Sequence, residues 1–314
     1  MSLTSILPEG ILFSGGTGRS GTTIIGKLLG RHSEIRASKP LEIKFLAANA
    51  GLLDLTFGRR EFIEMKKRRH LIYRVLSMSK TYSQRELERK FRDRLRGEWW
   101  DGSKVAGKSP GLSSGCPIEV RESAFSDYMR DRRREPEAAA VRFFETMIRA
   151  QSNNKGERIW IDTSPPNIFN ADRIHRLLPH AKFIHMKRDG RNTIASVLKE
   201  HWGPTDPLRA IYWWKNRVIA SHKALERVPR ESFIEIQLEE ISHFDRENQY
   251  LRLLSFVGLD DDAAMRAFFE REVDGQRVIQ ARWREEISEP LFEAKFRAVH
   301  RELEELGIST ALYD

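Results

Sequence analysis

The feature that most constrains this 314-residue chain is a glycine-rich turn placed directly after its first expected strand, at about residues 11–15. The turn reads Gly15-Gly16-Thr17-Gly18-Arg19-Ser20-Gly21-Thr22-Thr23, and apolar residues at helical spacing follow at 24, 25, 28 and 29. A strand, turn and helix in this order surround a small anion with backbone N–H groups and the positive end of a helix dipole. We therefore predict that a phosphorylated ligand binds here.

The kind of phosphate carrier depends on residue 22. Loops that hold a triphosphate with Mg²⁺ carry a Lys at this position, but here it is Thr22. The cation lies inside the loop instead, at Arg19, and three hydroxyls follow it. This set favours a metal-free 5′-phosphate or phosphosulfate. The alternative is an ordinary glycine turn in a βα unit, which four glycines within residues 15–21 disfavour.

A second strand-to-helix turn lies downstream. Residues 182–187 are expected to form a buried strand, and the sequence Arg188-Asp189-Gly190-Arg191-Asn192-Thr193-Ile194-Ala195-Ser196 leads through a polar turn into a helix expected over residues 194–200. Arg188 lies at the end of the strand, and Ser196 follows eight residues later. Both side chains could approach one further phosphate.

The two motifs together carry a resemblance. GTGRSGTT resembles the 5′-phosphosulfate loop of the sulfotransferases that use 3′-phosphoadenosine 5′-phosphosulfate (PAPS), and RDGRNTIAS is similar to their 3′-phosphate motif. The resemblance covers about two-thirds of the chain and omits roughly residues 52–155. It implies that Gly18, Arg19, Ser20, Gly21, Thr22 and Thr23 hold the 5′-phosphosulfate, that Arg188 and Ser196 hold the 3′-phosphate, and that Arg282 and Trp283 close over the nucleotide.

The chain departs from this family's pattern in two places. Relatives commonly carry a Lys that assists the leaving oxygen where this chain has Thr163, so three alternatives stay open: Lys44, Lys108 or no residue in this role. The family's Tyr-Glu-Asp-Leu turn is replaced by Leu238-Glu239-Glu240-Ile241. An aromatic contact to adenine would then come from another part of the chain.

The order of the expected elements predicts the fold class. Strands at about 11–15, 159–162, 182–187 and 232–236 alternate with helical patterns, which indicates a parallel sheet with helices on both faces and a ligand at the carboxyl ends of the strands. With the resemblance, this predicts an α/β, three-layer P-loop-like fold. Helical periodicity between residues 59 and 151 predicts a helical cap inserted at about 52–155 of a single domain spanning 1–314.

The net charge of +9 is concentrated in one segment. Residues 59–98 contain fourteen Lys and Arg against six Asp and Glu. Such a patch attracts acidic substrates, nucleotides or nucleic acid, although a solvated helical face is an equally good interpretation. Trp202, beside Gly203 and Pro204, is a candidate pocket wall, whereas the spacing of Trp213 and Trp214 favours the core.

Composition limits location and cofactors. No apolar run approaches the roughly 20 residues that span a bilayer, and the first residues do not form a signal peptide, so a cytoplasmic protein is expected. Cys116 is the single cysteine, which excludes a disulfide within the chain and favours a small buried or loop thiol. The nine His are scattered without metal-ligand spacing, so no metal is expected.

Sulfuryl transfer also needs a base that takes the proton of the acceptor. In many bacterial, tyrosylprotein and heparan sulfotransferases a Glu after the first helix has this role, and the matching segment PLEIKF implies Glu42 here. A surface Glu at a helix start is the alternative. Small-molecule cytosolic sulfotransferases use a His instead, so His32, His70 and His201 stay open.

The function that these observations predict is transfer of the sulfuryl group of PAPS, by in-line displacement, to a hydroxyl or amine of a small-molecule, lipid or carbohydrate acceptor, with an anionic acceptor among the options. One alternative is a nucleotide-dependent kinase, which the missing loop Lys disfavours. The other is a non-catalytic nucleotide-binding or nucleic-acid-binding protein that uses the basic helices, although no nucleic-acid partner is expected.

Overall fold

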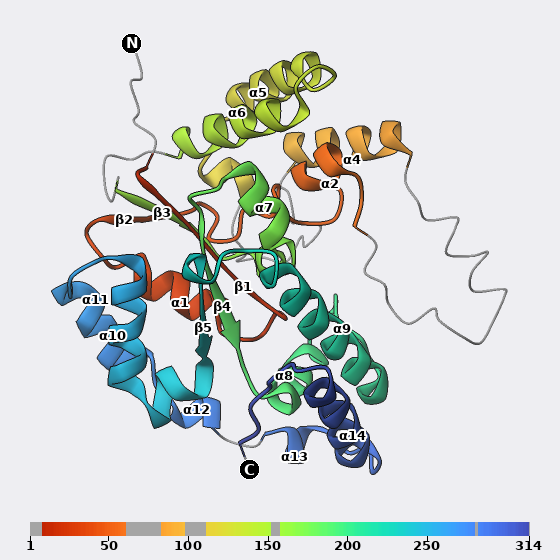
Figure 1. Cartoon of the computed structure of the whole chain (residues 1–314), viewed down its shortest axis with the longest axis vertical. Helices are drawn as coiled ribbons and strands as arrows, with labels where there is room; N and C mark the ends of the chain where they lie inside the picture. Colours follow the sequence, from red (N-terminus) through yellow and green to blue (C-terminus); the bar gives the residue numbers. More distant parts are fainter. Residues whose placement is uncertain (1–7, 61–82, 98–110, 152–157, 280–281, 314) are drawn as a thin grey trace, which may run out of the picture. The chain divides into compact units, whose positions relative to one another are not determined.

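The computed structural model describes residues 8–60, 83–97, 111–151, 158–279 and 282–313 (Figure 1). The chain divides into two compact units. An α/β unit comprises Pro8–Ala37 and Asn154–Asp314, and a helical unit comprises Ser38–Asn153. Both phosphate motifs belong to the α/β unit.

The α/β unit contains one parallel sheet of five strands. They are β1 (Gly10–Gly16), β2 (Ile35–Ala37), β3 (Ile159–Asp162), β4 (Lys182–Lys187) and β5 (Phe233–Gln237), in the order β2-β3-β1-β4-β5. Four of them lie within one residue of the predicted bounds. The three-residue β2 was not predicted, because so short a segment with an Arg at its centre has no recognisable strand pattern.

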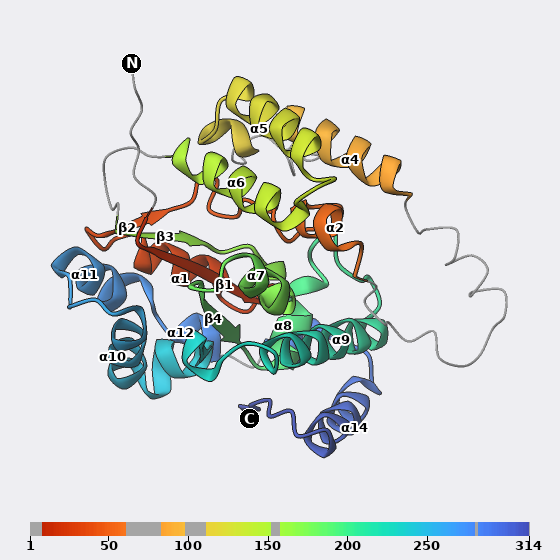
Figure 2. The same ribbon diagram turned by 45° about the horizontal axis from the view of Figure 1, so that its top comes forward.

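Alternate residues of the strands face two different helical layers. One face packs Leu12, Ile184 and Ile236 with the apolar sides of α1 (Thr22–Leu29), α10 (Arg246–Val257) and α11 (Ala263–Glu272). On the other face Phe13 forms ring contacts with Trp160 and Phe183, with centroids 6.0 and 5.9 Å apart. Figures 1 and 2 show α10 and α11 on one side of the sheet and α9 (Pro207–Leu225) on the other. The predicted three-layer α/β fold is confirmed.

A second apolar cluster supports the helix of the RDGRN motif. It joins α8 (Gly190–Val197) and α9 to α13 (Trp283–Glu286) and α14 (Phe292–Glu305). Trp214 is buried in it, with its ring centroid 5.0 Å from that of Phe296, as its helical spacing predicted. The remaining elements of the unit are η2 (Pro165–Asn170), α7 (Ala171–Leu177), η3 (Arg230–Ser232), the π-helical turn η4 (Glu240–Phe244) and α12 (Gln276–Ile279).

The described part of the helical unit contains α2 (Leu52–Phe57), α4 (Gln84–Arg96), η1 (Gly111–Ser114), α5 (Ile118–Asp131) and α6 (Pro136–Arg149), and no strand. Its core is aromatic: the ring of Phe143 contacts those of Phe45, Phe91 and Tyr128. Cys116 is buried there, and burial raises the pKa of its thiol to about 11, so the thiol stays protonated at neutral pH. None of the described helices is long and apolar enough to cross a membrane.

Candidate functional site

The glycine-rich turn after β1 adopts a conformation that depends on its glycines. The backbone has positive φ at Gly18 (88°), Arg19 (59°) and Gly21 (96°) before α1 begins at Thr22. A Cβ atom on Gly16 would lie 2.3 Å from the Oγ of Ser20 and 2.5 Å from a backbone oxygen of β4. The turn therefore depends on glycine at positions 16, 18 and 21, whereas Arg19 adopts a left-handed conformation with its side chain present.

The amino end of α1 has no side-chain cap. Gly21 is its N-cap and supplies no side-chain hydrogen bond to the first helical N–H groups. Ser20 is 1% exposed, and its Oγ has no hydrogen-bond partner among the described residues. Uncapped N–H groups and an unpaired buried hydroxyl at the positive end of a helix are the donors that an anion requires.

The second motif meets the first one at Arg19. The Nε of Arg19 donates to the Oγ of Ser196 at 2.9 Å, and the Nη1 of Arg188 donates to the backbone oxygen of Arg19 at 3.1 Å. The Nη1 of Arg19 also lies 3.3 Å from a carboxylate oxygen of Glu200. The structure thus brings together three of the predicted cofactor residues, and it adds Glu200, which the sequence analysis did not identify.

Positive charge is concentrated at this point. Burial lowers the pKa of Arg188, and the charges of Arg19 and Arg282 lower it further, whereas Glu239 acts in the opposite direction. Like charges gathered in a partly buried place attract an anion strongly, because the anion relieves their mutual repulsion. Arg282 therefore belongs to the same electrostatic environment as the two motifs.

Two buried carboxylates fix the start of α8. Asp189 and Arg191 are wholly buried and form an ion pair at 2.7 Å, and Asp189 also caps the helix by accepting from the backbone N–H of Arg191. Glu239 accepts from the backbone N–H of Asp189 at 3.0 Å, and burial raises the pKa of Glu239. This capping starts α8 at Gly190, four residues before the predicted start. The backbone N–H groups of Asp189 and Arg191 already have acceptors. An anion bound at the start of α8 would therefore depend on the side chains of Arg188 and Ser196.

Trp283 has a packing role. It is 5% exposed, the guanidinium carbon of Arg191 lies 4.9 Å from its ring centroid, and the ring of Phe292 lies 6.0 Å away. The sequence analysis predicted that Trp283 closes over the nucleotide. This packing supports Arg191, and closure over the nucleotide stays a prediction for both Arg282 and Trp283.

An aromatic wall lies beside the glycine-rich loop. Trp202 is 50% exposed, and a Cβ atom on Gly18 would lie 3.6 Å from its ring and 4.0 Å from that of Trp213. The two tryptophan rings have centroids 6.2 Å apart. The sequence context of Trp202, at a helix end, predicted a wall residue. The helical spacing of Trp213 favoured the core, and its position near the loop was not predicted.

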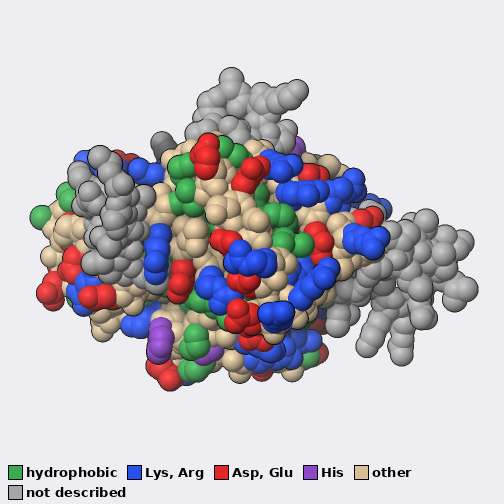
Figure 3. All heavy atoms as spheres, turned by 90° about the horizontal axis from the view of Figure 1, so that it is seen from above, with side chains coloured by type: hydrophobic (Ala, Val, Ile, Leu, Met, Phe, Trp, Pro, Cys, Tyr) green, Lys and Arg blue, Asp and Glu red, His purple; other side chains and the backbone are tan. Residues whose placement is uncertain are grey.

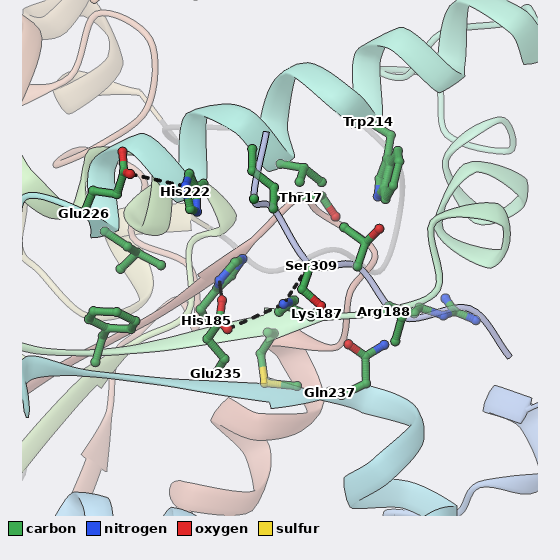
Figure 4. A pocket seen from close by; sticks show the side chains of 18 of the residues that line it. Thr17, His185, Lys187, Arg188, Trp214, His222, Glu226, Glu235, Gln237 and Ser309 are labelled. Atoms are coloured by element: carbon green, nitrogen blue, oxygen red, sulfur yellow. Dashed lines mark hydrogen bonds and ion pairs between the residues drawn. The ribbon is translucent and has the colours of Figure 1, made fainter. Parts of the chain in front are cut away.

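A cavity of about 300 Å³ extends from the loop along β4 and β5, beneath α9 and the segment Gly307–Ala311 (Figure 4). Thr17 and Arg188 line it, so it adjoins both motifs.

His185 and Glu235 form a hydrogen bond at 3.0 Å inside this cavity. Burial alone would raise the pKa of Glu235, but the hydrogen bond from His185 and the nearby charge of Lys187 outweigh burial and hold this pKa at about 2. No sequence pattern indicated this network, because its residues alternate with apolar ones in buried strands.

The segment that follows β3 packs under the loop. The Nδ2 of Asn167 donates to Asp162 at 2.6 Å and to the backbone oxygen of Ser14 at 3.3 Å. Thr163, which stands where relatives carry a Lys, is wholly buried. Of the two lysines considered as substitutes, Lys44 belongs to the helical unit and Lys108 lies outside the described residues.

The candidate bases lie in different surroundings. Glu42 belongs to the helical unit, its side chain is 27% exposed, and its carboxylate lies 3.3 Å from the Nζ of Lys44. It does not begin a helix, contrary to the structural alternative considered for it.

His32 uses both ring nitrogens, because Nδ1 accepts from the N–H of Glu34 and Nε2 faces the backbone oxygen of Asp260. His201 is exposed, and His70 lies outside the described residues.

Comparison with known proteins decides the class. The model of the sulfotransferase family matches residues 12–263. The chain belongs to this family. Three solved structures share its fold. The sulfotransferase domain of the Synechococcus PCC 7002 olefin synthase is 16% identical, with 97% of each chain covered and a TM-score of 0.51. The sulfotransferase domain of the curacin biosynthetic pathway is 14% identical, with 98% of this chain and 100% of that chain covered and a TM-score of 0.52, and STF9 from Mycobacterium avium is 14% identical, with 98% and 79% covered and a TM-score of 0.51. The search of curated proteins gave no match.

The family assignment establishes a sulfotransferase enzyme and decides against the kinase and non-catalytic alternatives. It also agrees with the open loop at α1, which lacks the Lys of a triphosphate site. Among the described residues no group of three or more His, Cys, Asp or Glu side chains could hold a metal ion.

Proposed function

We propose that this sulfotransferase takes its sulfuryl group from PAPS. Gly18, Arg19, Ser20, Gly21, Thr22 and Thr23 would hold the 5′-phosphosulfate, and Arg188 and Ser196 the 3′-phosphate, with Arg282 beside them. The observation that carries this proposal is the link from Arg188 through the backbone of Arg19 and from the Arg19 side chain to Ser196. These contacts join the two motifs directly, which supports their binding one ligand with two charged groups.

The residues present fit such a donor. The uncapped end of α1 and the unpaired hydroxyl of Ser20 offer neutral donors for one anion, and Arg188 with the neighbouring Arg19 and Arg282 supplies charge for a second. When bound, PAPS supplies the sulfuryl group and leaves as a nucleotide bisphosphate. The loop N–H groups and Arg19 would stabilise the negative charge that develops on the leaving phosphate. We further propose that Glu42 removes the proton of the acceptor.

The acceptor that we propose is a small-molecule, lipid or carbohydrate hydroxyl or amine that also carries negative charge. The support comes from the helical unit, where Arg85, Arg89, Arg92 and Arg96 lie on one side of α4 at positions i, i+4, i+7 and i+11. They line a groove of about 520 Å³ between α4 and α5. The groove also contains the apolar side chains of Phe125 and Met129, so it suits a ligand with an apolar body and acidic groups.

The charge of this groove is only partly balanced within the chain. Arg96 pairs with Glu122 at 2.8 Å, whereas Arg85 and Arg92 form no ion pair with another described residue. Figure 3 shows one face of the molecule, on which Lys and Arg side chains lie among Asp and Glu side chains. The predicted basic residues 61–82 lie outside the described residues.

The test combines ligand binding with turnover. Adenosine 3′,5′-bisphosphate should raise the melting temperature without Mg²⁺ and by more than ADP or ATP does at equal concentration, because only this ligand fills both anion sites. Transfer of the labelled sulfuryl group from PAPS to a panel of neutral and acidic acceptors then tests the reaction. Greater stabilisation by ATP with Mg²⁺ would contradict the choice of PAPS. A cytoplasmic location remains a prediction, which fractionation of the producing cells would test.

A further inference from the structure

The segment 306–313, called the strap below, crosses the α/β unit after α14 without forming a helix or strand. Polar contacts hold its middle: the Nζ of Lys187 donates to the backbone oxygen of Ser309 at 2.9 Å, and the Nε2 of His300 lies 2.8 Å from that of Thr310. Residues 307–311 of the strap form one wall of the cavity beside β4 and β5 (Figure 4). Apolar packing holds the strap as well, because Ile308 is buried in the second apolar cluster and Leu312 packs against that cluster.

Tyr313 at the end of the strap touches the two turns that flank the predicted 3′-phosphate site. Its backbone N–H donates to the Oδ2 of Asp189 at 3.0 Å, and its backbone oxygen accepts from the Nη2 of Arg191 at 3.1 Å. Its hydroxyl donates to Glu240 at 2.7 Å, and its ring stacks on that of Phe244 with centroids 5.2 Å apart. Burial and the nearby Glu240 raise the pKa of the Tyr313 hydroxyl, which therefore stays protonated and can donate.

The contact with Asp189 matters because this carboxylate is wholly buried. Its Oδ2 receives two donors, the Nη2 of Arg191 and the N–H of Tyr313. Loss of one donor from a buried carboxylate is costly, since no water replaces it. Asp189 is the residue next to Arg188 and the N-cap of α8, which carries Ser196. A displaced Asp189 would therefore move both side chains assigned to the 3′-phosphate.

The contact with Arg191 extends the same support to Arg282. The guanidinium of Arg191 is held between Asp189 and the backbone oxygen of Tyr313 and lies over the ring of Trp283. Trp283 directly follows Arg282 in the chain. One backbone position on the strap thus supports both cations, Arg188 and Arg282, that we assign to the nucleotide.

We infer that Tyr313 is a positioning residue for the 3′-phosphate end of the donor site, acting through Asp189 and Arg191. The inference rests on the proposed use of PAPS. It differs from a general stabilising role, because it predicts a selective loss: ligands with a 3′-phosphate should lose affinity, while binding of a 5′-phosphate at the loop of α1 should be retained.

Three substitutions separate the contacts of Tyr313. Tyr313→Pro removes the backbone N–H together with the side chain, Tyr313→Ala keeps the N–H and removes the ring, and Tyr313→Phe removes only the hydroxyl. Dissociation constants of adenosine 3′,5′-bisphosphate and adenosine 5′-phosphate are measured by calorimetry on each, and the melting temperature is recorded. Leu306→Ala is the control, because Leu306 is exposed on the same strap.

The expected result is a graded loss of preference for the bisphosphate. Tyr313→Pro should lower the affinity ratio of bisphosphate to 5′-phosphate by about 10-fold, the size of one hydrogen bond to a charged group. Tyr313→Ala should lower it by a smaller factor, and Tyr313→Phe and Leu306→Ala should leave it within about twofold. If the Pro variant does not fold, Tyr313→Ala carries the test, since loss of the contacts with Glu240 and Phe244 frees the backbone that reaches Asp189 and Arg191.

Two results would overturn the inference, and they can be told apart. If Arg188→Ala lowers the ratio but Tyr313→Pro and Tyr313→Ala only lower the melting temperature, the strap is a stabilising element and the donor assignment stands. If the unmodified enzyme does not prefer the bisphosphate, or Arg188→Ala leaves the ratio unchanged, the proposed 3′-phosphate site is wrong and the role of Tyr313 is lost with it.

Discussion

The Nε of Arg19 donates a hydrogen bond of 2.9 Å to the Oγ of Ser196, across 177 positions of the sequence. Ser196 is the acceptor in this contact, so its own proton remains available for a ligand oxygen. Arg19 also contacts a carboxylate oxygen of Glu200 with its Nη1, at 3.3 Å. The position of the Arg19 side chain therefore depends on Ser196. We expect binding of an anion at one of the two sites to change the affinity of the other.

The first prediction concerns Arg188. Arg188→Ala should weaken binding of adenosine 3′,5′-bisphosphate by about 1.5–3 kcal/mol, the range for a hydrogen bond to a charged group, and weaken adenosine 5′-phosphate much less. Calorimetric titration with both nucleotides measures the difference. Arg209→Ala, which removes an exposed arginine at the start of α9, is the matched control. An equal loss for both nucleotides would contradict the assignment of Arg188 to the 3′ end.

The second prediction concerns Glu200, whose carboxylate competes with a bound anion for Arg19. Glu200→Gln removes this competitor, so both nucleotides should bind more tightly, by about two- to fivefold given that the pair is partly exposed. The gain should shrink at high salt, where exposed charges are screened. Glu226→Gln, on the distant end of α9, controls for the change in net charge. A loss of affinity in Glu200→Gln would mean that Glu200 holds Arg19 in its binding position.

The sequence predicted the parts of the site that depend on local pattern. A strand followed by four glycines, an Arg and three hydroxyls has few structural solutions, and the loop at Gly16–Thr22 is one of them. The strand bounds of β1, β3, β4 and β5 were predicted for the same reason, since each is an apolar run next to a turn or helix pattern. β2 has no such pattern and exists because β3 provides a partner.

The parts that were not predicted depend on contacts between distant residues. Glu200 and Tyr313 look like ordinary surface residues in sequence. Their partners, Arg19 and Asp189, lie far away along the chain and come close to them only in the folded unit. Trp283 matched a family motif by position, but its burial against Arg191 is a tertiary property. Such contacts leave no periodic signal in a single sequence.

The third prediction concerns acid stability. Glu235 has a pKa of about 2 in the folded protein, below the ordinary value near 4.3, so its ionised form stabilises the fold above about pH 5. This contribution is lost as the pH falls from about 5 toward 2. Glu235→Gln cannot titrate, so its deficit in the free energy of unfolding should be largest near pH 7 and shrink toward pH 3. Urea unfolding at several pH values measures this; a deficit that is independent of pH would contradict the role of the charge.

The fourth prediction concerns the groove on the helical unit. The double substitution of Arg89→Ser and Arg92→Ser should raise the KM for an acidic acceptor several-fold and reduce the dependence of KM on salt, with the KM for PAPS unchanged. Arg133→Ser with Arg134→Ser removes the same charge from exposed positions after α5 and serves as the control. If both double variants behave alike with an acidic acceptor, the arginines of α4 form a solvated face and not a binding groove.

The last prediction concerns Glu42 and follows from the need to remove a proton from the acceptor as the bond to sulfur forms. Glu42→Gln keeps the size and polarity of the side chain but cannot take up the proton, so affinity for adenosine 3′,5′-bisphosphate should persist while turnover falls by about 10²- to 10⁴-fold. Both quantities are measured on the same preparation, with His32→Ala, His70→Ala and His201→Ala beside it. His32 already uses both ring nitrogens, so its variant should lose stability and not turnover alone. Near-normal turnover in Glu42→Gln, together with an inactive His70 or His201 variant, would assign the base to that histidine.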